Sequence, residues 1–231
     1  MSNFGNILLW VVYPYAMLLS FFIGTIWRLR KPGGVTAKSS ELLEKKRLIW
    51  GSILFHIGIL GVFMGHVIGI FIPESWTNAI GISDHFYHVY MAMTMGGIFG
   101  VMALVGVLVL VYRRFTNLRV FATSSLTDSI VIVALAVTII LGMLSSFVAG
   151  PLDPSFDYRL NISIWGRTLF MLQPQWQMMA GNVVPLIYKL HIICGLAMFG
   201  FFPYTRLVHA LYVPLHYIFR RFVVYRRYPR K

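Results

Sequence analysis

The sequence predicts an all-α integral membrane protein, a bundle of five transmembrane helices. Its 231 residues are 58% hydrophobic and 12% charged, whereas soluble domains carry about 25% charged residues. Five apolar stretches are each long enough to cross a hydrocarbon core of about 30 Å. Their apolar character is continuous instead of alternating, which favours helices over the strands of a membrane barrel. Lipid is therefore the expected main solvent of the chain.

The five stretches follow one another within a single transmembrane domain, residues 1–231. Each holds about 20 or more mostly apolar residues, the length that a helix needs to span the bilayer. The connection before the fifth stretch is rich in Pro, Asn, Gln and Trp, so we expect a cap with short helical pieces. The C-terminal tail interleaves aromatic residues with arginines, which fits a position on the inner membrane surface or against a soluble partner. The expected spans are 5–27, 49–72, 88–112, 127–149 and 185–209, the cap is 150–184, and the tail is 213–231.

The basic residues lie mostly on one side of the predicted bundle. Seventeen of the 20 Lys and Arg residues follow the first span, follow the third span, or lie at and beyond the end of the fifth. The positive-inside rule then places the N-terminus outside and the C-terminal tail in the cytoplasm. The net charge of +13 is thus mainly a topology signal. No basic stretch is large enough to fold alone, which argues against nucleic-acid binding.

Four histidines occupy the predicted spans at two depths. Ionisable side chains are costly inside a membrane and usually mark function. The second span runs outward, so His56 lies nearer the inside and His66 nearer the outside. The fifth span runs inward, so His191 is its outer histidine and His209 its inner one. Depth therefore pairs His66 with His191 and His56 with His209, an arrangement that suits two haems with two axial histidines each.

The spacing of these histidines differs between the two spans. Ten residues separate His56 from His66 and eighteen separate His191 from His209, which is about 15 Å and 27 Å along ideal helices. We expect Pro203 to kink the fifth helix and to absorb part of the difference.

Glycines accompany the histidines. Gly61, Gly65 and Gly69 recur at four-residue intervals, and Gly195 lies four residues after His191. A flat macrocycle must approach the helix backbone closely, which glycine permits; helix packing through small residues is the other interpretation. The seven acidic residues lie in loops or at helix ends, and the single cysteine forms no metal-binding motif. Haem therefore fits better than a zinc or di-iron centre, which recruits carboxylates or thiolates.

Four segments carry a resemblance to a known family: AKSSELLEKK at 37–46, LFHIGILGVFMGHVIGIFIP at 54–73, YKLHIICG at 188–195 and FPYTRLVHA at 202–210. Over nearly its whole length the chain resembles the gamma subunit of respiratory nitrate reductase, the membrane cytochrome b of that complex. The resemblance implies that His56 and His209 are the axial ligands of an inner haem b, and His66 and His191 those of an outer haem b. It further implies two partners on the cytoplasmic side, an iron–sulfur beta subunit and a molybdenum alpha subunit that reduces nitrate.

The resemblance also implies a quinol site beside the outer haem. In this family a basic residue at the start of the third span helps to bind the quinone oxygen, and His88 is the nearest match, with His85 as the alternative. The candidates for quinol binding are Gly65, His66, His88 and Lys189. The implied reaction oxidises menaquinol or ubiquinol near the outer face and passes electrons through the two haems to the iron–sulfur partner.

Two arginines and the overall function allow more than one interpretation. Arg113 and Arg206 are candidates for contacts with the propionates of the inner haem, or they are topology charges of the inner face. The expected location is the plasma membrane of a prokaryote that respires nitrate. Other functions compatible with the residues are a cytochrome b subunit of a formate dehydrogenase, hydrogenase or sulfur-metabolism complex, a haem-free transporter, and a membrane anchor. For His216 we expect no role beyond a position on the surface or at a docking site.

Overall fold

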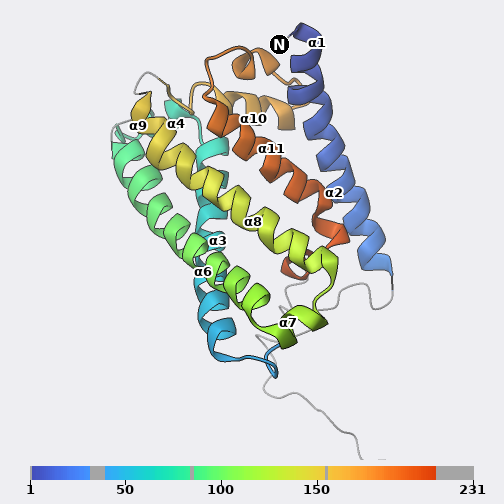
Figure 1. Ribbon diagram of the computed structural model, residues 1–231. Coiled ribbons are helices and arrows are strands. Elements are labelled where there is room, and N and C mark those ends of the chain that lie inside the picture. Colours follow the sequence, from blue (N-terminus) through green and yellow to red (C-terminus); the bar gives the residue numbers. More distant parts are fainter. Residues whose placement is uncertain (1, 32–39, 84–85, 154–155, 212–231) are drawn as a thin grey trace, which may run out of the picture.

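The computed structural model describes residues 2–31, 40–83, 86–153 and 156–211 (Figure 1). Every regular element within these ranges is helical, and five helices there are long and apolar enough to cross a membrane. This confirms the predicted all-α bundle of five spans. His85, His216 and the tail 213–231 lie outside the described residues. The spans run Asn3–Arg30, Lys46–Phe71, Tyr87–Thr116, Leu126–Leu152 and Leu186–Tyr204.

Within the described residues, three of the spans include a π-helical segment, and short helices connect the spans. The first span is α1 (Asn3–Ile7), η1 (Leu8–Val12, π) and α2 (Tyr13–Arg30). The second is α3 (Lys46–Phe71), followed by α4 (Glu74–Ala79). The third is η2 (Tyr87–Met95, π) and α6 (Gly96–Thr116), followed by α7 (Leu118–Thr123). The fourth is α8 (Leu126–Leu144), η3 (Ser145–Ala149, π) and α9 (Gly150–Leu152). The cap contains α10 (Ile162–Phe170) and η4 (Trp176–Met179), and the fifth span is α11 (Leu186–Phe201), η5 (Phe202–Tyr204) and then η6 (Arg206–Ala210).

The long helices pack one against the next in the order α3, α6, α8, α11 and α2. α3 packs mainly on α6, α6 also contacts α8, and α11 packs on α2 and α8. In Figure 1, α2 and α6 form opposite edges of the bundle, and α8 and α11 run between them. Gly58 and Gly106 bring α3 and α6 together, because a Cβ at Gly58 would lie 2.7 Å from the Ala103 Cα and one at Gly106 would lie 2.7 Å from the Phe55 Cα. Such close backbone approach is how small residues stabilise helix pairs in membranes.

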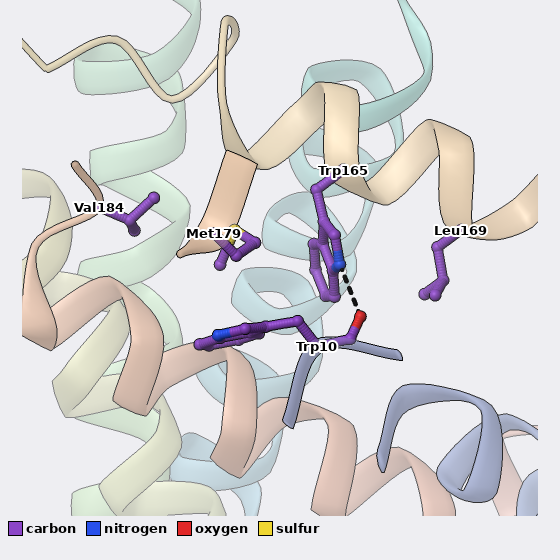
Figure 2. Close-up of a cluster of buried hydrophobic side chains, with 5 residues drawn as sticks. All are labelled: Trp10, Trp165, Leu169, Met179 and Val184. Atoms are coloured by element: carbon purple, nitrogen blue, oxygen red, sulfur yellow. Dashed lines mark hydrogen bonds between the residues drawn. The ribbon is translucent and has the colours of Figure 1, made fainter. Parts of the chain in front are cut away.

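A tryptophan pair attaches the cap to the first span. An α-helix would use the Trp10 carbonyl to accept from the amide four residues later, but that residue is Pro14, which has no N–H. The Trp165 indole supplies the missing donor, with Nε1 2.9 Å from the Trp10 oxygen, and the two rings meet edge to face at 5.8 Å. Figure 2 shows this hydrogen bond within the buried cluster of Trp10, Trp165, Leu169, Met179 and Val184.

The cap also closes the C-terminal end of α3. Ser163 Oγ donates to the Gly69 carbonyl at 2.8 Å, and Arg167 Nη1 donates to the Ile70 carbonyl at 2.9 Å. The last turn of a helix leaves carbonyls without intrahelical partners, and unpaired carbonyls are costly in a membrane. We call this end of the bundle, which carries α10 and η4, the cap end.

Arg113 organises the opposite end, which we call the basic end. Its buried guanidinium donates from Nε to Glu44 Oε2 at 2.6 Å, from Nη1 to Ser40 Oγ, and from Nη2 to the Ser40 and Glu44 carbonyls. The Arg47 backbone amide, which donates to the other carboxylate oxygen, and Arg113 together hold the pKa of Glu44 below its usual range. Arg113 thus connects the end of α6 to the chain that enters α3.

The fifth span ends earlier than expected. α11 stops at Phe201, η5 contains Pro203, and Thr205 is extended with φ −111° and ψ 178°. The Thr205 hydroxyl then accepts from the Leu207 amide at 3.1 Å and begins η6. The expected helix over 185–209 is therefore wrong beyond Phe201. His209 lies on a separate 3₁₀ turn, because Pro203 and the extended Thr205 interrupt the helical hydrogen bonds.

Replacing Arg113 by Gln should destabilise the basic end, since it leaves the Glu44 carboxylate without its counter-charge. We expect a loss of about 3 kcal/mol in the free energy of unfolding, measured by denaturant titration in detergent micelles. Because the Glu44 pKa is lower in the folded protein, this stabilisation is present above the unfolded pKa and is lost as the pH falls through the folded pKa.

Lys45→Gln is the control for this prediction. Lys45 forms an exposed ion pair with Glu41 at 3.3 Å, so its loss should change stability by less than about 1 kcal/mol. Equal destabilisation by both substitutions would contradict the role given to Arg113.

Candidate functional site

The structure brings the four membrane histidines together as two pairs. The ring centroids of His66 and His191 are 5.9 Å apart, and those of His56 and His209 are 6.2 Å apart. α3 supplies one histidine of each pair, while α11 and η6 supply the others. These are the pairs that depth in the sequence predicted. The unequal sequence spacing is accommodated because the chain turns at Pro203 and Thr205 and presents His209 opposite His56.

All four imidazoles have the same ring nitrogen engaged. Nδ1 of each lies within hydrogen-bond distance of a backbone carbonyl, and a carbonyl only accepts, so each Nδ1 carries the proton. Nε2 of each neutral ring is then the unprotonated nitrogen, with a lone pair for a metal. The acceptors are Ser52 O for His56 at 2.7 Å, Val62 O for His66 at 2.8 Å, Thr138 O for His191 at 3.0 Å, and Arg206 O for His209 at 2.5 Å.

The distances within the pairs fit one metal ion between two imidazoles. Metal–imidazole bonds are about 2.0–2.1 Å long, so an ion shared by two Nε2 atoms places the ring centroids about 6 Å apart. Across the described part of the chain no group of three or more His, Cys, Asp or Glu could hold a bare metal ion. Two protein ligands suffice where a macrocycle supplies the equatorial ones. The donor set therefore fits a haem in each pair.

The glycines near the histidines have different neighbours. A Cβ at Gly65 or at Gly195 would meet nothing within 4 Å, whereas one at Gly61 would collide with the Phe99 ring. Gly61 thus serves the contact between α3 and α6. Gly65 and Gly195 border open space next to His66 and His191, where a flat ligand could approach the backbone.

The cap-end side of the His66 pair has aromatic and basic neighbours. His88 is exposed on η2, and its ring centroid lies 6.4 Å from that of Tyr158. Tyr158 also covers Gly69, since a Cβ there would lie 3.8 Å from the Tyr158 ring. Burial raises the pKa of the Tyr158 phenol, so the hydroxyl stays protonated. Tyr158 escaped the sequence analysis because its nearness to α3 depends on how the cap folds back.

Lys189 lies on α11 but is directed toward the cap. Its Nζ donates to the Gly181 carbonyl at 2.5 Å, and Gly181 has a φ of +67°, a conformation that favours glycine. Lys189 therefore holds the loop before α11, and no described contact joins it to His66 or His88.

Known proteins are similar to this chain over most of its length. A family model described as nitrate reductase gamma subunit matches residues 6–228. The chain belongs to the nitrate reductase gamma subunit family. It is 42% identical over 221 residues to the nitrate reductase gamma chain of Bacillus subtilis, covering 95% of this chain and 97% of that one.

Two further relatives show how widely the family sequence is used. The respiratory nitrate reductase 2 gamma chain of Escherichia coli is 34% identical over 231 residues, with 98% of this chain and 99% of that one covered. The nitrate reductase-like protein NarX of Mycobacterium tuberculosis is 40% identical over 221 residues, but the match spans 95% of this chain and 33% of that protein. The gamma-subunit sequence thus also occurs as about a third of a longer chain.

Arginines near the inner pair have different roles in this gamma-subunit family member. Arg113 makes four hydrogen bonds to Ser40 and Glu44, so its guanidinium is engaged within the chain. Its neighbour Arg114 has two buried nitrogens, Nε and Nη1, without a hydrogen-bond partner in the described part of the chain. Arg206 forms an ion pair with Asp128 at 3.0 Å and remains 40% exposed. Sequence alone could not separate Arg113 from Arg114, because both are basic residues at the end of one apolar span.

Alanine substitution should change the free energy of unfolding differently at Gly61 and at Gly65. Gly61→Ala should lower the free energy of unfolding by about 1–3 kcal/mol, since the new methyl collides with Phe99. Gly65→Ala should leave the stability of the haem-free chain unchanged or raise it by about 0.5–1 kcal/mol, because alanine favours the helix. Denaturant titration of both variants makes the comparison, and equal losses would contradict the separation.

Proposed function

We propose that this chain is the di-haem cytochrome b subunit of a respiratory nitrate reductase, oxidising quinol on behalf of the complex. The observation that carries the proposal is the pair of facing histidines at each of two levels, with every Nδ1 hydrogen-bonded and every Nε2 left to bind iron. A transporter or a membrane anchor gives no reason for this arrangement. Membership of the gamma subunit family favours nitrate reductase over formate dehydrogenase, hydrogenase or sulfur-metabolism complexes.

His66 and His191 would hold the outer haem b, and His56 and His209 the inner one. When bound, the two haems would supply one-electron carriers that lead from quinol toward the partner subunits. The chain's own contribution is to orient four imidazoles with hydrogen bonds and to place those of α3 opposite those of α11 and η6. The proposed partners are an iron–sulfur beta subunit and a molybdenum alpha subunit that reduces nitrate.

The sidedness of the proposal rests on charge. The cap end has few basic residues and the basic end has many, so the positive-inside rule places the cap end outside and the basic end in the cytoplasm of a prokaryotic cell. Quinol oxidation near the cap end would then release protons outside. Partners at the basic end would receive the electrons inside, and the separation of charge would energise the membrane.

The proposed quinol site lies beside the outer histidine pair. Gly65 leaves room against the α3 backbone, and His66 brings the outer haem close. His88 is exposed and can accept a proton from a quinol hydroxyl, while the protonated Tyr158 hydroxyl can hydrogen-bond the quinol oxygen. Lys189 donates to the Gly181 carbonyl, so it would bind quinol after giving up this hydrogen bond. Menaquinol and ubiquinol present the same hydroxyl groups to these residues.

The propionate carboxylates of the inner haem would have cationic neighbours. Arg206 lies three residues before His209, and its carbonyl already orients that imidazole. Among the described residues, two buried nitrogens of Arg114 have no hydrogen-bond partner, and an anion would satisfy these N–H groups. We therefore propose Arg206 and Arg114 as the propionate contacts of the inner haem.

His66→Ala should remove the outer haem and abolish quinol oxidation, because it deletes one of that haem's two axial nitrogens. The measurement is a reduced-minus-oxidised spectrum of the purified complex, with the haem extracted and counted per chain. The wild type should contain two non-covalent b haems that a quinol analogue reduces. A wild type without haem, or a His66→Ala complex with both haems and full activity, would refute the proposal.

His88→Ala and Tyr158→Phe should keep both haems and weaken quinol binding. Each removes one hydrogen-bonding group, so we expect the KM for a quinol analogue to rise about two- to tenfold. Tyr90→Phe is the matched control, since Tyr90 is an exposed phenol on the same π-helix, and its KM should stay at the wild-type value. An unchanged KM in both test variants would exclude these residues from the quinol site.

A further inference from the structure

The four histidines obtain their orientation in two different ways. His56, His66 and His209 donate from Nδ1 to a carbonyl three or four residues earlier in their own segment. His191 donates to the carbonyl of Thr138, which lies on α8. The first three rings are therefore oriented by their own backbone turn. The orientation of His191 depends on where α8 lies relative to α11.

α8 also lacks a side chain at the point where it meets this imidazole. A Cβ at Gly142 would lie 2.8 Å from His191 Cε1, 3.3 Å from Nδ1 and 3.4 Å from Nε2. Gly142 follows Thr138 by four residues, so the acceptor carbonyl and the missing side chain lie on one face of α8. The edge of the ring thus lies directly on the α8 backbone.

We propose that α8 positions the outer axial histidine, with the Thr138 carbonyl orienting the His191 ring and Gly142 leaving the space that the ring occupies. This inference rests on the proposed haem function and assigns a task to the fourth span, which contributes no axial ligand. Thr138 and Gly142 act through His191 and are positioning residues.

The arrangement makes the outer haem depend on helix packing in a way that the inner haem does not. A hydrogen bond from Nδ1–H to a carbonyl raises the basicity of Nε2, and a more basic ligand stabilises oxidised iron. Displacing His191 from Thr138 should therefore raise the midpoint potential of the outer haem or release that haem. The His56 and His209 bonds remain intact because each is local to its own segment.

Gly142→Ala in the intact complex tests the proposal. We expect either loss of the outer haem, from two haems per chain to one, or an upward shift of its midpoint potential in an optical redox titration, with the inner haem unchanged. Gly100→Ala is the matched control, because its methyl would meet α8 at the flexible Met143 sulfur, 2.6 Å away, without touching a histidine. Gly100→Ala should retain both haems at their wild-type potentials.

A second variant keeps the test valid if Gly142→Ala disturbs assembly. His191→Ala removes the ring that the new methyl would meet, so adding Gly142→Ala to His191→Ala should cause no further loss of assembled complex. This double-mutant comparison isolates the contact between residue 142 and the imidazole. A greater loss of assembled complex from Gly142→Ala in the presence of His191 than in its absence would support the proposal.

Four results would overturn the inference. Gly142→Ala with both haems at wild-type potentials would show that the glycine does not position the ligand. Equal shifts of both haems, or an equal loss of assembled complex with and without His191, would show a general packing defect. In these three cases the wild-type haem count still stands as a separate test of the haem function. A wild type without haem would overturn the haem function and this inference together.

Discussion

A hydrogen bond between an imidazole Nδ1–H and a backbone carbonyl is the interaction on which the proposed site depends. It occurs at His56, His66, His191 and His209, and it does two things at each. It pairs a polar N–H that would otherwise be costly in a membrane interior. It also selects the tautomer in which Nε2 carries the lone pair. Without these four bonds, sequence spacing would place two histidines at one depth but would not fix their tautomers.

The rest of the fold holds the segments that carry the histidines opposite each other. α3 obtains its packing from α6 through Gly58 and Gly106, and α11 obtains its packing from α2 and α8. The cap fixes the end of α3 through Ser163 and Arg167. Each helix therefore has partners of its own, so the space between α3 and α11 need not be filled by side chains.

Outside the histidine pairs, polar side chains donate hydrogen bonds to backbone carbonyls that lack a partner within their own helix. Pro14 frees the Trp10 carbonyl, and the Trp165 indole occupies it. The last carbonyls of α3 are taken by the cap, and Arg113 holds the Ser40 and Glu44 carbonyls together with the Glu44 carboxylate. Two adjacent arginines thus differ, since Arg113 has its hydrogen-bond partners within the chain whereas two buried nitrogens of Arg114 have none among the described residues.

The sequence by itself determined the five spans, the two depths of histidines and their pairing, because span length and depth follow from continuous apolar runs and the alternating direction of the spans. The segments around the histidines also identified the family. Only the tertiary structure showed that His209 lies on a separate turn after Pro203 and that Gly61 belongs to helix packing. It also placed Tyr158 near His88 and brought the Thr138 carbonyl and Gly142 to His191. These features depend on contacts between segments far apart in the chain, which hydropathy and spacing along one helix do not encode.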